Sequence, residues 1–190
     1  MTTATTSMPK NHLCPHTFAF MLDNIFRRCL QHPRKVVGEY LRPGDTVIDL
    51  GCGPGFFTID MAKIVGPTGK VIAVDLQRPM LDKVARKAKR HSVAEWVAYH
   101  LCEADRIGLE AKADFILAFY MIHETPDPRA YLMQIKALMK ADARLLVVEP
   151  KMHVSKQAYE LMARQAEEVG LCVLDHPLKK GGRSLLLGLK

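Results

Sequence analysis

Two kinds of hydrophobic pattern alternate along this chain. Short runs rich in Val, Ile and Leu predict buried strands, and between them apolar residues recur at three- and four-residue steps, as on one face of a helix. The predicted strands are 46–50, 70–75, 96–102, 114–119, 144–149, 171–175 and 184–189. The predicted helices are 17–41 with a break at Pro33, 57–65, 79–90, 129–140 and 155–169.

This order of elements predicts an α/β fold. Strands that alternate with helices form a parallel sheet with helices on both faces. The last two predicted strands have no helix between them, so they must pair as a hairpin and make one edge of the sheet antiparallel. Ligands of such sheets bind beyond the carboxyl ends of the strands, where the strand order reverses. We therefore expect the site after Leu50, Val74, Leu101, Phe119 and Val148.

Length and composition favour one globular domain. The chain has 190 residues, of which 25% are charged, and no apolar stretch approaches the roughly 20 residues of a membrane span. We predict a flexible tail over 1–16 and one domain over 17–190, in which the segment 17–41 forms a helical lid. The 5 cysteines are widely spaced and include no C-x-x-C, which favours apolar packing in a reducing, cytoplasmic setting over a disulfide framework.

The formal net charge of +7 allows two interpretations. The excess of Lys and Arg in 78–90 and 179–183 forms either a surface that attracts anions such as nucleic acid, or a solvated helix face. No aromatic residues interleave with these charges, as stacking on single strands requires. The solvated face is therefore favoured.

The segment 49–55 reads Asp-Leu-Gly-Cys-Gly-Pro-Gly and joins a predicted strand to a predicted helix. Glycines let the backbone turn sharply and approach a ligand with no Cβ in the way, and a strand, such a turn and a helix form a nucleotide-binding arrangement. Counted from Gly51, Phe56 stands where the dinucleotide fingerprint has Gly or Ala, and no Gly-Lys-Ser/Thr follows. Neither NAD nor a triphosphate is therefore favoured.

Two carboxylates accompany this loop, one at its start and one at the end of the next predicted strand. Asp75 ends the second predicted strand, where a carboxylate can accept hydrogen bonds from the 2′ and 3′ hydroxyls of a ribose. It lies too far upstream to cap the helix 79–90 well. Asp49 precedes the loop, and a buried carboxylate needs a partner. Its partner is either a cation, such as the ammonium of an amino-acid moiety, or the loop amides that it caps.

With these residues the sequence resembles the class I S-adenosylmethionine (SAM)-dependent methyltransferases over 33–150. The segments 47–58, 71–76, 102–105 and 113–119 resemble the four motifs of that family in order, and 145–149 resembles the strand after them. Within the family the chain is most similar to the small-molecule branch that includes ubiquinone/menaquinone and arsenite methyltransferases.

The resemblance implies a Rossmann-like, seven-stranded, mostly parallel sheet with an antiparallel C-terminal hairpin and helices on both faces. It implies SAM as cofactor and S-adenosylhomocysteine as product. The residues that it places around the cofactor are Asp49, Gly51, Cys52, Gly53, Gly55, Phe56, Phe57, Asp75, Leu76, Met80, Glu103, Ala104, Asp105 and Phe119.

The resemblance also assigns roles within this set. Asp49 and the loop backbone hold the methionine part, and Asp75 binds the ribose. Leu76 and Met80 sandwich the adenine, and Phe119 closes the far wall. Glu103 accepts a hydrogen bond from the adenine amino group beside the amide of Ala104, or Asp105 does so if the register slips by two residues.

The candidate catalytic residues are Tyr120, His123 and Glu124, which follow the fourth predicted strand. Methyl transfer from a sulfonium needs mainly alignment, and a base only if the nucleophile must lose a proton. His123 either takes that proton or packs locally before Pro126. Glu124 orients His123 or binds a cationic substrate, and Tyr120 lines the pocket or only covers the sheet edge.

Two further patterns concern metals and thiols. His12, Cys14 and His16 alternate, but zinc would need a fourth ligand or an open water site, and we predict no metal. Arsenite-type chemistry would require Cys14, Cys52 and Cys102 to converge on the pocket, which the sequence does not show.

The sequence thus predicts a SAM-dependent methyltransferase that acts on a small-molecule acceptor by in-line transfer. The Asn/Asp-Pro-Pro-Tyr signature of many amino-group methylases of DNA and protein is absent after the fourth predicted strand, which disfavours a nucleobase amine. The alternatives are an RNA methyltransferase, suggested by the positive charge, and a non-catalytic SAM-binding module.

Overall fold

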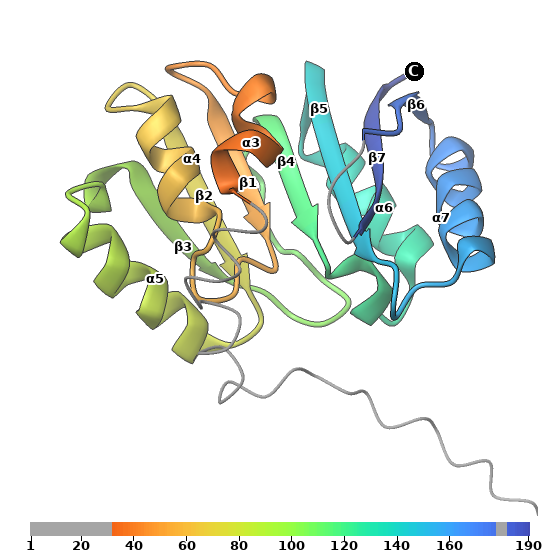
Figure 1. Cartoon of the computed structure of the whole chain (residues 1–190), viewed down its shortest axis with the longest axis horizontal. Coiled ribbons are helices and arrows are strands. Elements are labelled where there is room, and N and C mark those ends of the chain that lie inside the picture. The colour runs from red at the N-terminus through yellow and green to blue at the C-terminus, as the bar shows by residue number, and fades with distance from the viewer. Residues whose placement is uncertain (1–31, 178–181) are drawn as a thin grey trace, which may run out of the picture.

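The computed structural model describes residues 32–177 and 182–190. They form one seven-stranded sheet in the order β3-β2-β1-β4-β5-β7-β6 (Figure 1). The strands are β1 (Thr46–Leu50), β2 (Lys70–Asp75), β3 (Val97–Leu101), β4 (Ala113–Phe119), β5 (Met139–Pro150), β6 (Leu171–Asp175) and β7 (Gly182–Leu189). The helices are α3 (Pro33–Val37), η2 (Gly38–Tyr40), α4 (Thr58–Val65), α5 (Arg78–Arg90), η3 (Ala94–Trp96), η4 (Ile122–Glu124), α6 (Pro128–Ala137) and α7 (Lys156–Glu168).

The order of the strands reverses at the centre of the sheet. From β1 the chain moves outward through β2 to β3, then returns to place β4 on the other side of β1. All pairings from β3 to β5 are parallel, whereas β7 runs antiparallel to both β5 and β6. The predicted fold class, including the antiparallel C-terminal hairpin, is confirmed. Residues that follow β1, β2, β4 and β5 therefore meet at one edge of the sheet.

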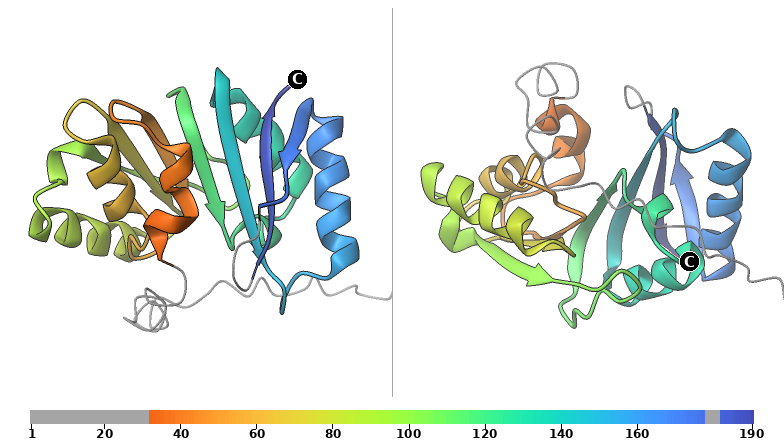
Figure 2. Two further views of the ribbon diagram at one scale, coloured as in Figure 1. Left: turned by 45° about the horizontal axis from the view of Figure 1, so that its top comes forward. Right: turned by 90° about the horizontal axis from the view of Figure 1, so that it is seen from below.

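Helices cover both faces of the sheet (Figures 1 and 2), and a hydrophobic core lies on each face. One packs α3, α4 and α5 against β1 to β5 and includes Val37, Met61 and Val84. The other packs α6 and α7 against the opposite face and includes Leu132 and Met162. Successive residues of a strand point to opposite faces, so in β1 Val47 belongs to the first core and Ile48 to the second.

Some predicted elements differ from the observed ones at their ends. The predicted helix 129–140 stops at Ala137, and β5 already begins at Met139, because Met139 pairs with Ala113 at the start of β4. A register shift separates this pair from the rest of the pairing between β4 and β5. The residues directly after Met139 are exposed, and the sequence did not predict a strand there. The short helix η4 after β4 was not predicted.

Several predictions fall outside the described residues or are limited by them. The tail 1–16, with His12, Cys14 and His16, and the part 17–31 of the predicted lid lie outside them. The described part of the lid is helical from Pro33. Across 32–177 and 182–190, Cys52, Cys102 and Cys172 are free thiols, and no helix there has the length and apolarity to cross a membrane.

A side chain caps the N-terminus of α6, the helix that follows the candidate catalytic segment. The Asp127 carboxylate accepts a hydrogen bond from the amide of Ala130 at 3.0 Å. Asp127→Ala should lower the free energy of unfolding by about 1 kcal/mol, measured by chemical denaturation. Asp127→Asn should retain most of the stability, because an amide oxygen can cap the same amide. Equal stability of the Ala variant and the parent would show that the cap contributes nothing.

Candidate active site

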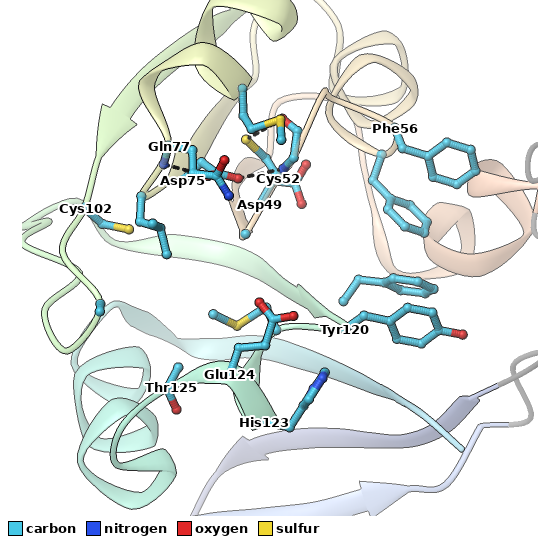
Figure 3. A pocket seen from close by; sticks show the side chains of 18 of the residues that line it. Asp49, Cys52, Phe56, Asp75, Gln77, Cys102, Tyr120, His123, Glu124 and Thr125 are labelled. Atoms are coloured by element: carbon cyan, nitrogen blue, oxygen red, sulfur yellow. Dashed lines mark hydrogen bonds between the residues drawn. The ribbon is translucent and has the colours of Figure 1, made fainter. Parts of the chain in front are cut away.

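A cavity of about 530 Å³ opens at the carboxyl ends of β1, β2 and β4. It contains most of the residues that the sequence analysis assigned to the cofactor, and all three candidate catalytic residues. Those that line it are Asp49, Gly51, Cys52, Gly53, Phe56, Phe57, Asp75, Leu76, Met80, Glu103, Ala104, Phe119, Tyr120, His123 and Glu124 (Figure 3). Gly55 and Asp105 do not line it. A Cβ on Gly55 would face Val84 of α5 instead, at 3.2 Å.

The loop between β1 and α4 approaches the cavity with its backbone. Gly51, Gly53 and Gly55 have φ values of 64°, 52° and 82°, a region that residues with a Cβ rarely adopt. A Cβ on Gly51 would also lie 2.9 Å from the Cβ of Met121. The amide of Cys52 donates to the carbonyl of Val74 at 3.0 Å. The loop is therefore held close to the end of β2, and its glycines leave room for a ligand.

Asp75 joins this loop to the segment after β2. Its carboxylate accepts hydrogen bonds from the amides of Gly53 and Gln77, both at 2.8 Å. Burial raises the pKa of Asp75, and the bonds from these amides oppose that shift. Each carboxylate oxygen has a second lone pair. Asp75 can therefore accept two more hydrogen bonds from a ligand in the cavity.

Asp49 lies at the centre of the site, on the face of β1 that is covered by α4. Thr58 of α4 donates its hydroxyl to Asp49 at 2.6 Å. Burial raises the pKa of Asp49 to about 7, the bond from Thr58 opposes the shift, and the charge of Asp75 adds to it. No Lys or Arg is among the described residues that line the cavity. A bound cation would therefore be the partner that stabilises ionised Asp49.

Aromatic rings form one wall of the cavity. The ring centroids of Phe56 and Phe57 are 5.0 Å apart, those of Phe57 and Phe119 4.6 Å, and those of Phe119 and Tyr120 4.2 Å. Tyr120 has a φ of 60°, a strained conformation for a residue with a side chain. Its amide donates to Val148 of β5 at 2.7 Å. This bond supports the turn that directs Tyr120 toward the other rings.

His123 lies opposite the glycine loop. The carboxylate of Glu149 is hydrogen-bonded to it on the side away from the cavity. The imidazole and the carboxylate of Glu124 point into the cavity (Figure 3), while His123 Nδ1 lies 2.5 Å from a Glu149 oxygen. Burial lowers the pKa of His123, but the hydrogen bond and charge of Glu149, with the charge of Glu124, outweigh it and raise the pKa above its usual value. Burial raises the pKa of Glu124.

Sequence reasoning missed several residues of the site. Glu149 was placed in a strand without a role. A charged residue at the end of a buried apolar run could have indicated that its carboxylate has a buried partner. The residues that line the cavity and had been given no role are Gln77, Met121, Thr125, Tyr131, Pro150, Met152 and His153. They come from different elements and loops, so their positions follow from tertiary packing.

Across 32–177 and 182–190, no group of three His, Cys, Asp or Glu side chains is placed to hold a metal ion. Cys52 and Cys102 both line the cavity. Burial raises the pKa of Cys102 to about 11 and that of Cys52 well above its usual value. Both side chains are therefore protonated near neutral pH when no ligand is bound.

Comparisons with known proteins agree with this geometry. The family described as "Methyltransferase domain" matches residues 41–182. This chain belongs to the SAM-dependent methyltransferases. A solved SAM-dependent methyltransferase from Aquifex aeolicus is 27% identical, with a TM-score of 0.80, and the match covers 91% of this chain and 97% of that one. The fold and the family predicted from the sequence are thus confirmed.

Several curated relatives are named as quinone methyltransferases. The demethylmenaquinone methyltransferase of Lactococcus lactis is 30% identical over 122 residues, which cover 62% of this chain and 48% of the relative. The 2-phytyl-1,4-naphtoquinone methyltransferase of Synechococcus elongatus is 29% identical over 133 residues, covering 68% and 54%. This chain therefore spans about half the length of the curated relatives that it matches.

Removal of the Asp75 carboxylate should weaken the binding of SAM. Hydrogen bonds to a charged group contribute about 1.5–3 kcal/mol each, so Asp75→Ala should raise the Kd at least ~10-fold in calorimetric titration. Asp82→Ala removes an exposed carboxylate of α5 that pairs with Arg78, outside the cavity, and should leave the Kd unchanged. An unaltered Kd in Asp75→Ala, with the fold intact, would rule out the ribose role.

The binding of SAM should also depend on pH through Asp49. A cation binds the ionised carboxylate, so below the Asp49 pKa of about 7 each ligand must displace one proton. The Kd should then rise up to about tenfold per pH unit as the pH falls below 7. Asp49→Asn should bind SAM more weakly but lose most of this pH dependence. A Kd of the parent protein that stays constant between pH 5 and ~8 would contradict this role.

Proposed function

We propose that this chain transfers the methyl group of SAM to a small, uncharged ring that carries a hydroxyl group, of the quinol type. The observation that carries the proposal is the composition of the cavity. Acidic residues and glycine backbone suited to SAM line one part of it, and aromatic rings line another part together with His123 and His153. The names of the curated relatives support a quinone-related acceptor.

The cofactor side of the cavity fits SAM by its chemistry. Asp49 would bind the ammonium group of the methionine part, and Asp75 the ribose hydroxyls. Leu76 and Met80 offer apolar surface for the adenine, and both line the cavity. Glu103 would accept a hydrogen bond from the adenine amino group beside Ala104. Asp105 is less suited to that role because it lies outside the cavity lining.

The acceptor side fits a neutral aromatic ring. Phe57, Phe119 and Tyr120 form a continuous row of rings with centroids 4.2–4.6 Å apart, against which a flat ring can stack. The described lining contains no Lys or Arg, so a carboxylate or phosphate on the acceptor would gain no ion pair. Acidic metabolites are therefore poor candidates.

SAM supplies a methyl carbon that its sulfonium has already activated, so that the C–S electron pair stays on sulfur when the methyl group leaves. The chain holds the acceptor in line with that carbon and excludes water, and alignment alone can contribute roughly 7–11 kcal/mol. His123 takes the hydroxyl proton of the acceptor. Glu124 points into the same space and favours the positive charge that His123 then carries.

An RNA acceptor is less well supported. The basic residues of α5 lie on its exposed side, whereas the cavity is lined by carboxylates that would repel a phosphate backbone. A module that only binds SAM would need no ionisable side chain at the acceptor end, where His123 and Glu124 lie.

The direct test is turnover. The purified full chain, with SAM and a short-chain 1,4-naphthoquinol kept reduced, should form S-adenosylhomocysteine and a methylated quinol, both detected by mass spectrometry. SAM binding without methylation of this quinol would count against the acceptor class. Failure to bind either SAM or S-adenosylhomocysteine would overturn the whole proposal.

Loss of the proposed base should reduce turnover rather than cofactor binding. His123→Ala should lower kcat by about 10²- to 10⁴-fold, while the Kd for SAM changes little. His91→Ala removes an exposed histidine at the end of α5 and should retain the parent kcat. A kcat of His123→Ala equal to that of the parent would remove His123 from the chemistry.

A further inference from the structure

Glu149 is a fully buried carboxylate just behind the acceptor end of the cavity. It is the penultimate residue of β5, is 0% exposed, and is not part of the cavity lining. Burying a carboxylate costs several kcal/mol unless hydrogen bonds or a charge compensate it. Every neighbour in β5 from Leu145 to Val148 is apolar. The position therefore calls for an explanation beyond packing.

Both hydrogen bonds that this carboxylate accepts come from His123. The backbone amide of His123 donates to one oxygen at 3.3 Å, and Nδ1 lies 2.5 Å from the other. With Glu149 ionised, its carboxylate can only accept hydrogen bonds, and Nδ1 then carries the proton. In the neutral imidazole Nε2 then has the free lone pair. Among the described residues, nothing donates to Nε2, and the ring points into the cavity (Figure 3).

The groups around His123 favour the protonated ring. Glu149 of β5 and Glu124 of η4 both raise the pKa of His123, against the effect of burial. The ring of His153 lies 6.2 Å away. Arg183 of β7 pairs with Glu149 in strand register, but its guanidinium donates to the carbonyl of Val154. Among these groups, the two carboxylates are the ones that favour a positive charge on the ring.

We propose that Glu149 is a positioning residue that holds His123 with its proton on Nδ1, so that Nε2 takes the proton of the methyl acceptor. This inference rests on the proposed function. The proton leaves the hydroxyl of the acceptor for Nε2, and the electron pair that it leaves behind is available to attack the methyl carbon. The positive charge lost from the sulfonium reappears on the imidazole ring, beside Glu149.

Apart from the amide of His123, which donates to Glu149, the backbone of the segment that carries His123 is held by hydrogen bonds that do not involve this carboxylate. The amide of Glu124 donates to Met121, and the amide and hydroxyl of Thr125 both donate to the carbonyl of Ile122, at 3.1, 3.1 and 2.7 Å. A change at Glu149 should therefore alter the imidazole more than the backbone of η4. This independence makes the role of the carboxylate testable by substitution.

Glu149→Gln keeps the size of the side chain and removes its charge. We expect kcat to fall by about 10²- to 10⁴-fold, with a Kd for SAM within about threefold of the parent. Since His123 acts in its neutral form, the loss of a group that raises its pKa should move the rising limb of the pH–kcat profile to lower pH. Glu167→Gln, an exposed carboxylate of α7, is the matched control and should change neither.

A double variant separates positioning from a general structural effect. If Glu149 acts through His123, adding Glu149→Gln to His123→Ala should lower kcat no further. An additional loss comparable to that of Glu149→Gln alone would show that Glu149 acts independently of His123, and would overturn the proposal.

Nuclear magnetic resonance of the ¹⁵N-labelled full chain tests the arrangement without any acceptor. The neutral His123 ring, assigned by its loss in His123→Ala, should carry its proton on Nδ1 and titrate at higher pH than in Glu149→Gln. A proton on Nε2 in the parent protein, or an identical titration in the two proteins, would overturn the proposal. An Nδ1–H ring in a protein that methylates no acceptor would support this hydrogen bond and contradict the proposed function instead.

Discussion

The hydrogen bond from the amide of Gly53 to the carboxylate of Asp75, at 2.8 Å, connects two segments that line the cavity. It links the loop after β1, in which Gly53 has a φ of 52°, to the acid that ends β2. The same carboxylate holds the amide of Gln77 just before α5. Asp75 therefore holds both the loop that leads to α4 and the segment that leads to α5 beside the cavity.

Three buried carboxylates around the cavity are stabilised in different ways. Asp75 accepts hydrogen bonds from backbone amides, Asp49 from the hydroxyl of Thr58, and Glu149 from His123. The backbone amides and the hydroxyl are neutral donors, so burial leaves both aspartates with raised pKa values and able to gain from a ligand. Glu149 has a partner that can itself become charged, which suits it to chemistry rather than to binding.

Much of the fold was predictable because the strands alternate with amphipathic helices. The run Thr-Val-Ile-Asp-Leu of β1 was located to the residue, and the lack of a helix between β6 and β7 predicted their antiparallel pairing. The early start of β5 was not predictable, since Met139 is in a strand only through its pairing with Ala113. In the site, the place of the glycine loop and Asp75 in the cavity lining was predictable from local sequence, because both directly follow or end a predicted strand.

The partnership of His123 and Glu149 spans 26 residues and could not be inferred from local spacing, yet it follows from strand pairing. β4 and β5 are parallel neighbours in which Phe119 lies opposite Val148. The chain beyond each of these residues therefore begins at the same level of the sheet. Tyr120 donates its amide back to Val148, and η4 turns over the end of β5, where Glu149 points to the face that η4 covers. In a parallel sheet, the register of two strands thus decides which side chain beyond one strand receives a buried partner from the next.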